Sequence, residues 1–230
     1  MRDRLPPLRR RQGAKTLERD CTVLGEDNMT TSQSSVVAIA LSTAFGFVGA
    51  VGSTEDPAKD QNLSGTIASS KRMADGKEWT TANLNVGTSS SYCYDDAESN
   101  CLQYGRLYAW ESAQRGCQSL GDGWRLPTDD EWRQMAKHYG GVSNDSPEKG
   151  KAAYAALLSG GTSGFNAVLG GNRSVDGKYE RLDAHGFYWT ASENDPITAP
   201  FYNFGKGGQA LYRQPQGQKQ MAISVRCVRE

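Results

Sequence analysis

The sequence contains few of the side chains from which metal and acid–base sites are usually built. It has only two histidines, His138 and His185, and neither has a partner residue at metal-ligand spacing. The charges favour no class of partner either, because 26 Lys and Arg residues balance 26 Asp and Glu residues. A chain without net charge has no global field to attract nucleic acid or an anionic membrane. We therefore expect no zinc site, no cofactor and no nucleic-acid partner.

Long apolar runs are scarce as well. Residues 36–51 form an apolar stretch interrupted by hydroxyl residues and glycines, too short for the roughly 20 residues that a membrane-spanning helix needs. The length of this stretch, and the small residues that end at Ala50, are typical of a signal peptide cleaved at that point. The lack of Lys or Arg between Met29 and Val36 leaves a poorly structured apolar tail as the alternative.

The first 65 residues therefore divide into three predicted segments. Residues 1–28 have no apolar periodicity and are either disordered or upstream of a true start at Met29. Residues 29–50 are the predicted signal peptide, and residues 51–65 are a flexible linker. We expect a secreted or extracytoplasmic domain over residues 66–230, with no stable membrane span after processing. Cys21 lies in the first segment and has no assigned role.

The middle of the domain carries a clear helix start. Thr128 and Glu131 have the spacing of a capping box, in which the hydroxyl and the carboxylate each accept a hydrogen bond from a free backbone amide. Apolar residues then recur at intervals of three and four, and Gly140 with Gly141 supplies a stop. The pattern predicts a helix over residues 129–139. Its apolar face consists of Trp132, Met135, Ala136 and Tyr139.

The last residues of the chain alternate in the manner of a strand. Cys227 shares one phase of the alternation with Met221, Ile223 and Val225, so it should face a core. Arg226 belongs to the opposite phase, with Ala222, Ser224 and Val228. The pattern predicts a closing strand.

Four of the five cysteines can be paired by spacing and by face. Cys117 ends a helical stripe, so its thiol should point inward like that of Cys227, and a bridge between them would close a loop of about 110 residues. Cys93 and Cys101 flank a polar, turn-forming segment and form a local pair. Four cysteines allow three pairings, so these two disulfides are a prediction that the sequence alone does not prove.

The remaining signals place helices before strands. Besides the helix at residues 129–139, apolar stripes predict a helix over residues 104–115 and a third helix after Ser146 and Pro147. Two to three helices followed by antiparallel strands, without βαβ alternation, predict an α+β domain. The strands are expected at residues 78–86, 187–192, 201–204, 210–213 and 221–228, with a hairpin turn at 205–208.

Seven ordered segments of the domain form a further pattern. They are Asp75-Gly-Lys-Glu-Trp-Thr-Thr-Ala-Asn-Leu-Asn85, Tyr92-Cys-Tyr94, Cys101-Leu-Gln-Tyr-Gly-Arg-Leu-Tyr-Ala-Trp110, Gly123-Trp-Arg-Leu-Pro-Thr-Asp-Asp-Glu-Trp132, Gly164-Phe-Asn-Ala-Val-Leu-Gly-Gly-Asn-Arg173, Phe187-Tyr-Trp-Thr-Ala-Ser-Glu193 and Ser224-Val-Arg-Cys-Val228. Together these segments resemble the signature segments of the Fibrobacter succinogenes major paralogous domain family over roughly residues 66–230.

The resemblance implies a C-type-lectin-like fold, related to that of the sulfatase-modifying (formylglycine-generating) enzymes. It also implies an extracytoplasmic bacterial protein, since most members are of that kind and have no assigned activity. Formylglycine-generating enzymes need reactive cysteines, whereas the matched cysteines here fit structural bridges. Two positions depart from the family's pattern: Leu169 stands where Pro is usual, and Asn172 stands where an aromatic residue is usual.

Acidic residues cluster at three places that invite a functional interpretation. The acids at positions 129–131 resemble a paired-carboxylate site, but the first turn of a helix favours acids in any case. Asp95, Asp96 and Glu98 offer hard oxygen ligands to calcium, although a polar turn closed by cysteines explains them equally well. Residues 193–196 resemble calcium ligands of C-type lectins without reproducing their order. We expect no metal and keep calcium-dependent sugar binding as an alternative.

Polar and aromatic residues gather between positions 193 and 220. Aromatic rings stack on sugar or peptide faces, and Arg and amide groups add directional hydrogen bonds. We therefore predict a non-catalytic recognition module for a glycan or a protein surface. The candidate ligand-binding residues are Glu193, Asn194, Tyr202, Asn203, Tyr212 and Arg213. The alternatives are a structural or envelope-assembly domain and an enzyme related to the sulfatase-modifying fold. A further alternative is that Phe201 and Phe204 belong to the core and the rest of this stretch is an ordinary solvated loop.

Overall fold

The computed structural model describes residues 69–230, so the predicted leader, signal peptide, linker and Cys21 lie outside the described residues. Within this range the chain forms four α-helices, one 3₁₀ turn and ten strands. The helices are α1 (Glu98–Tyr104), α2 (Trp110–Gln118), α3 (Asp129–His138) and α4 (Pro147–Leu157), and the 3₁₀ turn is η1 (Tyr94–Asp96). The prediction of two to three helices was too low, because α1 carries no apolar stripe that marks it.

The strands form three sheets. The largest has the order β6-β5-β7-β8-β9, and its pairs are antiparallel except β5 with β7. A second sheet has the order β1-β2-β10, and β3 pairs with β4. The strands are β1 (Ser70–Arg72), β2 (Glu78–Thr80), β3 (Ser91–Tyr92), β4 (Leu107–Tyr108), β5 (Gly170–Arg173), β6 (Tyr179–Leu182), β7 (His185–Trp189), β8 (Thr198–Gly205), β9 (Ala210–Gln218) and β10 (Val228–Arg229). The domain is therefore α+β, as predicted.

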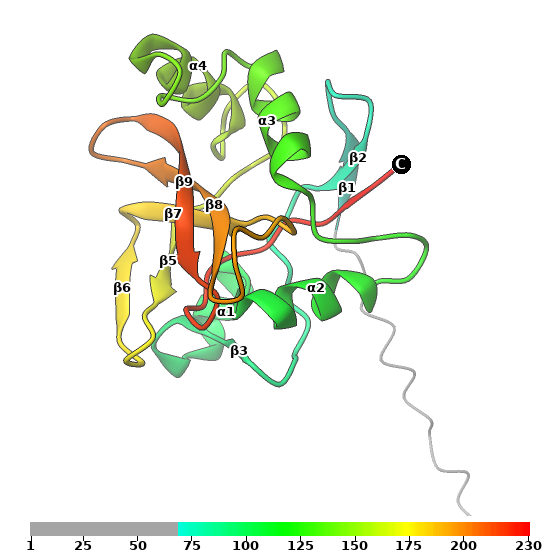
Figure 1. Cartoon of the computed structure of the whole chain (residues 1–230), viewed down its shortest axis with the longest axis vertical. Helices are drawn as coiled ribbons and strands as arrows, with labels where there is room; N and C mark the ends of the chain where they lie inside the picture. Colours follow the sequence, from blue (N-terminus) through cyan, green and yellow to red (C-terminus); the bar gives the residue numbers. More distant parts are fainter. Residues whose placement is uncertain (1–68) are drawn as a thin grey trace, which may run out of the picture. The chain divides into compact units, whose positions relative to one another are not determined.

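The five-stranded sheet packs against helices on both faces (Figure 1). On one face, side chains of β7, β8 and β9 form a core with α3 and α4; it includes Tyr188, Tyr202, Phe204, Trp132 and Leu157. On the other face, Phe187 and Trp189 join a second core with α2. None of the helices in residues 69–230 has the length and apolar character needed to cross a bilayer.

The prediction of one helix over residues 104–115 is wrong. The chain leaves the helix at Gly105, whose φ of +75° ends α1, and Leu107 and Tyr108 then pair with β3 before α2 begins at Trp110. A Cβ at position 105 would lie 2.5 Å from the Asn83 Cβ, so the break depends on glycine. The apolar residues of this region do face the interior, but from three short elements.

The strand expected at residues 78–86 ends at Thr80, but several other local predictions are confirmed. Helix α3 begins with both hydrogen bonds of the capping box between Thr128 and Glu131. Helix α4 begins at Pro147, although the Ser146 hydroxyl donates to the Glu148 carboxylate and makes no cap bond. The β8–β9 hairpin closes at Gly205, which pairs with Ala210.

The closing segment differs from the alternating strand that we expected. Residues 222–228 are all buried, and only β10 at their end pairs as a strand. Arg226 is 0% exposed. Its buried guanidinium donates hydrogen bonds to Asn83 Oδ1 and to the carbonyl oxygens of Thr80, Phe165 and Asn166 at 2.6–2.9 Å. These internal acceptors replace water around a buried cation, whose pKa burial lowers. The segment therefore crosses the interior with both of its faces covered.

Both predicted cysteine pairings are confirmed at disulfide distance. Cys93 pairs with Cys101, eight residues apart, at the entrance to α1. Cys117 of α2 pairs with Cys227 over a separation of 110 residues, and both are fully buried. The long bridge joins the closing segment to α2, and the short one closes a local loop.

The two disulfides should differ in their contributions to stability. The chain-entropy model assigns about 5 kcal/mol to a loop of 110 residues and about 2.5 kcal/mol to one of eight, because the longer loop restricts the unfolded chain more. We expect Cys117→Ala/Cys227→Ala to lose more unfolding free energy than Cys93→Ala/Cys101→Ala in urea titrations of the purified domain. Equal losses would contradict this ranking.

Candidate functional site

Two of the predicted ligand-binding residues face helix α3 instead of solvent. Tyr202 is fully buried, its ring stacks on Trp132 at 5.1 Å, and its hydroxyl donates to Asp129. Arg213, which pairs with Tyr202 across the hairpin, holds the Asp129 carboxylate at 2.7–2.8 Å. Tyr202 is thus part of the core, and Arg213 is a positioning contact for α3. Neither presents the free surface that the sequence suggested.

The side chains of the exposed loop before β8 bond to one another and to residues in and just after β9. The Glu193 carboxylate accepts a hydrogen bond from Lys219 at 2.5 Å, and the Asn194 amide donates to the Pro215 carbonyl. Both carboxylate oxygens of Asp195 accept from residues 197 and 198. The side-chain oxygens compared above with lectin calcium ligands therefore close a turn. Glu193 and Asn194 lie on the surface, apart from the residues described next.

Asn203 and Tyr212 lie on the face of the sheet opposite to α3. Asn203 is paired with Phe187 of β7 on one side and with Tyr212 of β9 on the other, so the three side chains form a row across three strands. The His185 ring stacks on Phe187 at 5.3 Å with an interplanar angle of 4°, and its Nδ1 lies 2.9 Å from Asn203 Oδ1. His185 and Tyr212 are half-buried, so their rings remain partly accessible.

A small pocket opens on the same face, with a volume of about 50 Å³. Its lining residues are Asn172, Arg181, Phe187, Phe201, Met221 and Ile223. Asn172 is 6% exposed, and its Oδ1 has no hydrogen-bond partner among the described residues. The Arg181 guanidinium lies 5.8 Å from the centroid of the Phe187 ring. The pocket therefore combines a cation with an apolar wall, whereas the Asn172 Oδ1 atom is itself buried.

We call Asn172, Arg181, His185, Phe187, Asn203 and Tyr212 together the sheet-face site. The sequence analysis proposed Asn203 and Tyr212 as candidate ligand-binding residues and did not propose the other four. Asn172 and Arg181 come from β5 and β6, two short strands that the sequence did not predict. One signal was available, because Asn172 is a position at which this chain departs from the family's usual aromatic residue.

A larger cleft of about 270 Å³ lies above Arg226. Side-chain amides of Asn83, Asn85 and Gln103 line it, and Leu102 at its rim is 78% exposed. The amide of Asn83 is already engaged by Arg226 and by the Tyr104 carbonyl oxygen. Asn83 and Arg226, which line this cleft, thus bond to other parts of the fold. The sheet face is therefore the candidate site.

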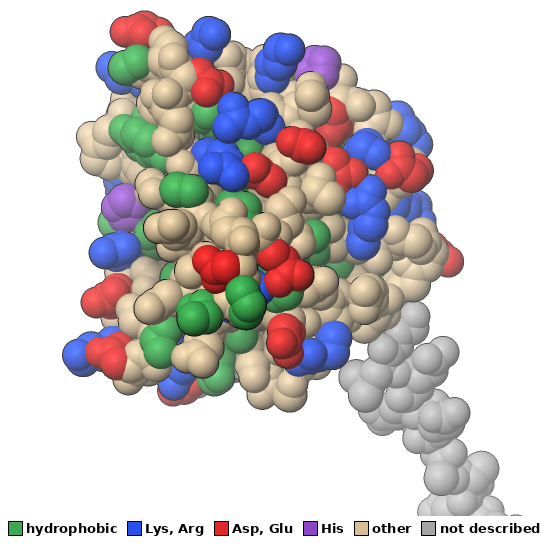
Figure 2. Space-filling model, in the orientation of Figure 1, with side chains coloured by type: hydrophobic (Ala, Val, Ile, Leu, Met, Phe, Trp, Pro, Cys, Tyr) green, Lys and Arg blue, Asp and Glu red, His purple; other side chains and the backbone are tan. Residues whose placement is uncertain are grey.

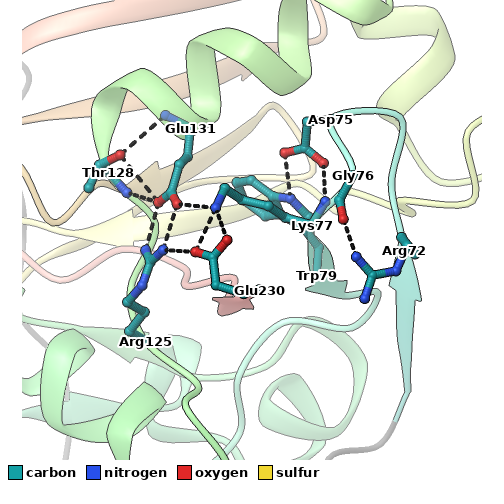
Figure 3. Close-up of polar contacts among 9 residues, drawn as sticks. All are labelled: Arg72, Asp75, Gly76, Lys77, Trp79, Arg125, Thr128, Glu131 and Glu230. Carbon is teal, nitrogen blue, oxygen red and sulfur yellow. Dashed lines mark hydrogen bonds and ion pairs between the residues drawn. The ribbon is translucent and has the colours of Figure 1, made fainter.

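Glu131 of α3 is engaged by the helix start and by an ion-pair network (Figure 3). Glu131 accepts from the Thr128 amide at 2.8 Å and forms a two-point hydrogen bond with Arg125, each at 2.7 Å. Arg125 also binds Glu230, and Lys77 bridges the two carboxylates at 3.4 and 2.5 Å. The network joins α3, the β1–β2 turn and the end of β10, so Glu131 is a structural residue.

The second acidic group, near the short disulfide, is also engaged. Asp96 accepts a 2.6 Å hydrogen bond from the Tyr179 hydroxyl, which connects η1 to β6. Among the described residues, the one cluster with metal-ligand spacing is Cys93, Glu98 and Cys101, and its two sulfurs are joined in the disulfide. We derive no metal centre from this cluster.

Comparison with known families gives a match over most of the chain. The model of the Fibrobacter succinogenes major domain matches residues 61–229, which include the sheet-face site and both disulfides. The chain belongs to this family. Comparisons with curated proteins and with solved structures gave no match. Membership in the Fibrobacter succinogenes major domain family thus explains the seven sequence segments that occur in the family's order. The family's description names no function.

The Glu131 network should make stability depend on pH. Burial opposes ionisation of Glu131, but hydrogen bonds from Arg125 and the Thr128 amide outweigh it and hold the pKa at about 2, against an ordinary value of 4.5. Because the folded pKa is the lower one, ionisation stabilises the fold above pH 4.5, and this stabilisation is lost as the pH falls toward 2. We expect Glu131→Gln to cost about 1 kcal/mol of unfolding free energy at pH 7, with the difference from wild type shrinking toward pH 2.

The matched control is Asp130→Asn, which removes an exposed acid from the same helical turn. It should change stability little at any pH. Urea titrations of the three proteins between pH 7 and pH 2 measure both effects. A Glu131→Gln effect that stays constant over this range would contradict the assigned role of the charge.

Proposed function

We propose that this domain is a non-catalytic, extracytoplasmic recognition module that binds a glycan through the sheet-face site. The observation that carries the proposal is the row of His185, Asn203 and Tyr212, whose two half-buried rings flank an amide beside a small pocket. We propose further that the fold is C-type-lectin-like and related to that of the sulfatase-modifying enzymes. The α+β architecture and the long disulfide are consistent with that relationship.

Two features support an extracytoplasmic location. Disulfides persist in oxidising compartments, and this domain has a buried one and a local one. The predicted signal peptide at residues 29–50 precedes the domain in the order that export requires.

The surroundings of the acids favour binding over catalysis. Asp129 is held by Arg213, and Glu131 by Arg125, so the two best-placed carboxylates of α3 serve as ion-pair partners. Figure 2 shows positive and negative side chains interspersed over the face that it displays, without a large patch of one sign. We therefore do not assign recognition to long-range electrostatic attraction. We assign it to the shape of the site and to directed hydrogen bonds.

Half-buried rings on a rigid sheet suit a sugar. The His185 and Tyr212 rings flank Asn203, which offers an amide at the level of the rings. Aromatic faces pack against the C–H faces of sugars at low entropic cost, and amides bind hydroxyl groups. Because strands fix these side chains, little ordering is needed on binding.

Removal of the two rings tests the site. We expect His185→Ala/Tyr212→Ala to weaken binding by at least tenfold to whichever ligand a glycan array identifies for the wild-type domain. The loss follows from two stacking contacts, each worth about 1 kcal/mol. Titration calorimetry measures the affinity, and thermal unfolding checks the fold.

The chain offers a matched control in its other histidine. His138 is exposed at the end of α3, so His138→Ala should leave the affinity unchanged. Unchanged affinity in the His185→Ala/Tyr212→Ala variant would move the site elsewhere. A wild-type domain that binds proteins on a protein array and no glycan would favour the envelope-assembly alternative.

A further inference from the structure

We propose that a cleft between α3 and α4 binds the phosphate group of a phosphorylated sugar. The cleft has a volume of about 280 Å³ and lies where α3 ends and α4 begins (Figure 1). Both helices pack on the face of the sheet opposite to the sheet-face site. This second site is therefore independent of the sheet-face site and of the function proposed for it. Its lining includes Arg133, Gln134, Lys137, Asp145, Lys149 and the turn at residues 140–142.

The lining of the cleft carries an excess of positive charge. Arg133 forms an ion pair with Asp145 at 3.4 Å, and because both side chains are nearly half exposed this pair is weak. Within residues 69–230, neither Lys137 nor Lys149 has an acidic side chain at ion-pair distance. Three cations thus face one acid, and two positive charges have no counterion from this part of the chain.

The helices give little reason for this gathering of cations. Arg133 and Lys137 lie four residues apart on α3, and like charges at that spacing repel each other. The dipole at the end of α3 does favour Lys137, but Lys149 lies in the first turn of α4, where the dipole disfavours a cation. Ser146, the N-cap of α4, makes no side-chain cap bond, and an acid at position 149 would complete a capping box with it. A bound anion would offset both unfavourable placements.

The glycine turn brings the start of α4 to the cations of α3. Gly140 and Gly141 both have a φ of +123°, which few other residues adopt. A Cβ at position 140 would lie 2.8 Å from the Ala152 Cβ, so the turn packs directly against α4. A Cβ at position 141 would lie 3.5 Å from the Cβ and Cδ atoms of Lys149, so the stem of that side chain runs along the turn. Backbone packing therefore holds Lys149 at the cleft.

A phosphate monoester matches the charge and the size of the cleft. It carries about two negative charges at pH 7, whereas a carboxylate or a sulfate ester carries one. The volume has room for roughly 20 non-hydrogen atoms, which is more than a bare anion needs. Gln134 adds an amide that can bind a sugar hydroxyl group.

An anionic membrane suits the cleft less well than a soluble sugar phosphate. The large apolar side chains exposed among the described residues are Leu102, Val175 and Ile197, and none of them lines the cleft. The surface around the three cations thus offers no apolar side chain for insertion into a bilayer.

Four small probes test the ligand on the full chain in titration calorimetry at pH 7 and low ionic strength. They are glucose 6-phosphate, glucose 6-sulfate, glucose and inorganic phosphate. We expect glucose 6-phosphate to bind at least fivefold more tightly than each of the others, because its second negative charge meets a second cation and its sugar contacts the cleft. Equal affinity for the sulfate ester or for inorganic phosphate would overturn the proposal. Binding to phosphatidic acid vesicles without binding to glucose 6-phosphate would overturn the choice of a sugar.

Reversal of one charge separates binding from stability. We expect Lys149→Glu to reduce affinity for glucose 6-phosphate at least tenfold and to raise the melting temperature, because an acid suits the start of α4. Lys137→Gln, at an exposed position of α3, should reduce affinity at least threefold. The matched control is Lys151→Glu, the same reversal at an exposed position of α4 outside the cleft, which should change affinity less than twofold.

Two results would overturn the assigned contacts. One is unchanged affinity in Lys149→Glu and Lys137→Gln. The other is an equal loss in Lys149→Glu and Lys151→Glu, which would show a response to the net charge of the chain and not to the cleft. The His185→Ala/Tyr212→Ala variant should bind glucose 6-phosphate as the wild type does, so failure of the sheet-face site and failure of this cleft can be told apart.

Discussion

The buried guanidinium of Arg226 is the contact on which the arrangement of the domain most depends. Burial of a cation costs several kcal/mol unless its N–H groups are satisfied. Here the acceptors come from three places: Thr80 at the end of β2, Asn83, and the Phe165–Asn166 loop before β5. The Phe165 ring lies 4.5 Å from the guanidinium carbon and adds a cation–π contact. Since the next residue, Cys227, is bridged to α2, one short segment fixes the relative positions of β2, α2 and the approach to β5.

The alternation of the β8–β9 hairpin then divides its polar and aromatic residues between two tasks. Tyr202 and Arg213 share one face and meet Asp129, so they hold the first turn of α3 against the sheet. Asn203 and Tyr212 are neighbours in sequence of these residues but point to the opposite face. Residues that looked like one group in the sequence are thus divided by a period of two. This division explains how the same hairpin supplies both the core and a partly exposed face of the sheet.

The sequence predicted those features that depend on a few residues or on the apolar face of one element. The capping box at Thr128, the Gly205 turn and the two cysteine pairings are each settled by a few residues or by the face of one element, and the structure confirms them. The break at Gly105 was missed because the apolar spacing continues across it, and the break depends on a close approach to Asn83, which is distant in sequence. The burial of Arg226 was missed for a related reason: its acceptors lie 60 to 146 residues away. Asn172 and Arg181 belong to strands too short and too rich in polar residues to show a period.

Asn172, beside the sheet-face pocket, carries one of the buried polar atoms that the fold leaves without a partner. A buried acceptor without a partner destabilises a fold by about 1–3 kcal/mol, which an apolar side chain of similar size would avoid. Of the five buried polar atoms without partners in residues 69–230, Asn172 Oδ1 belongs to the residue that lines this pocket. The Asn172 Nδ2 donates to the Ser174 hydroxyl, which in turn donates to Glu180, so the unused acceptor is a consequence of a specific hydrogen-bond chain. A frame tied by Arg226 and the Cys117–Cys227 bridge can carry this local cost, because neither of these contacts involves the Asn172 amide.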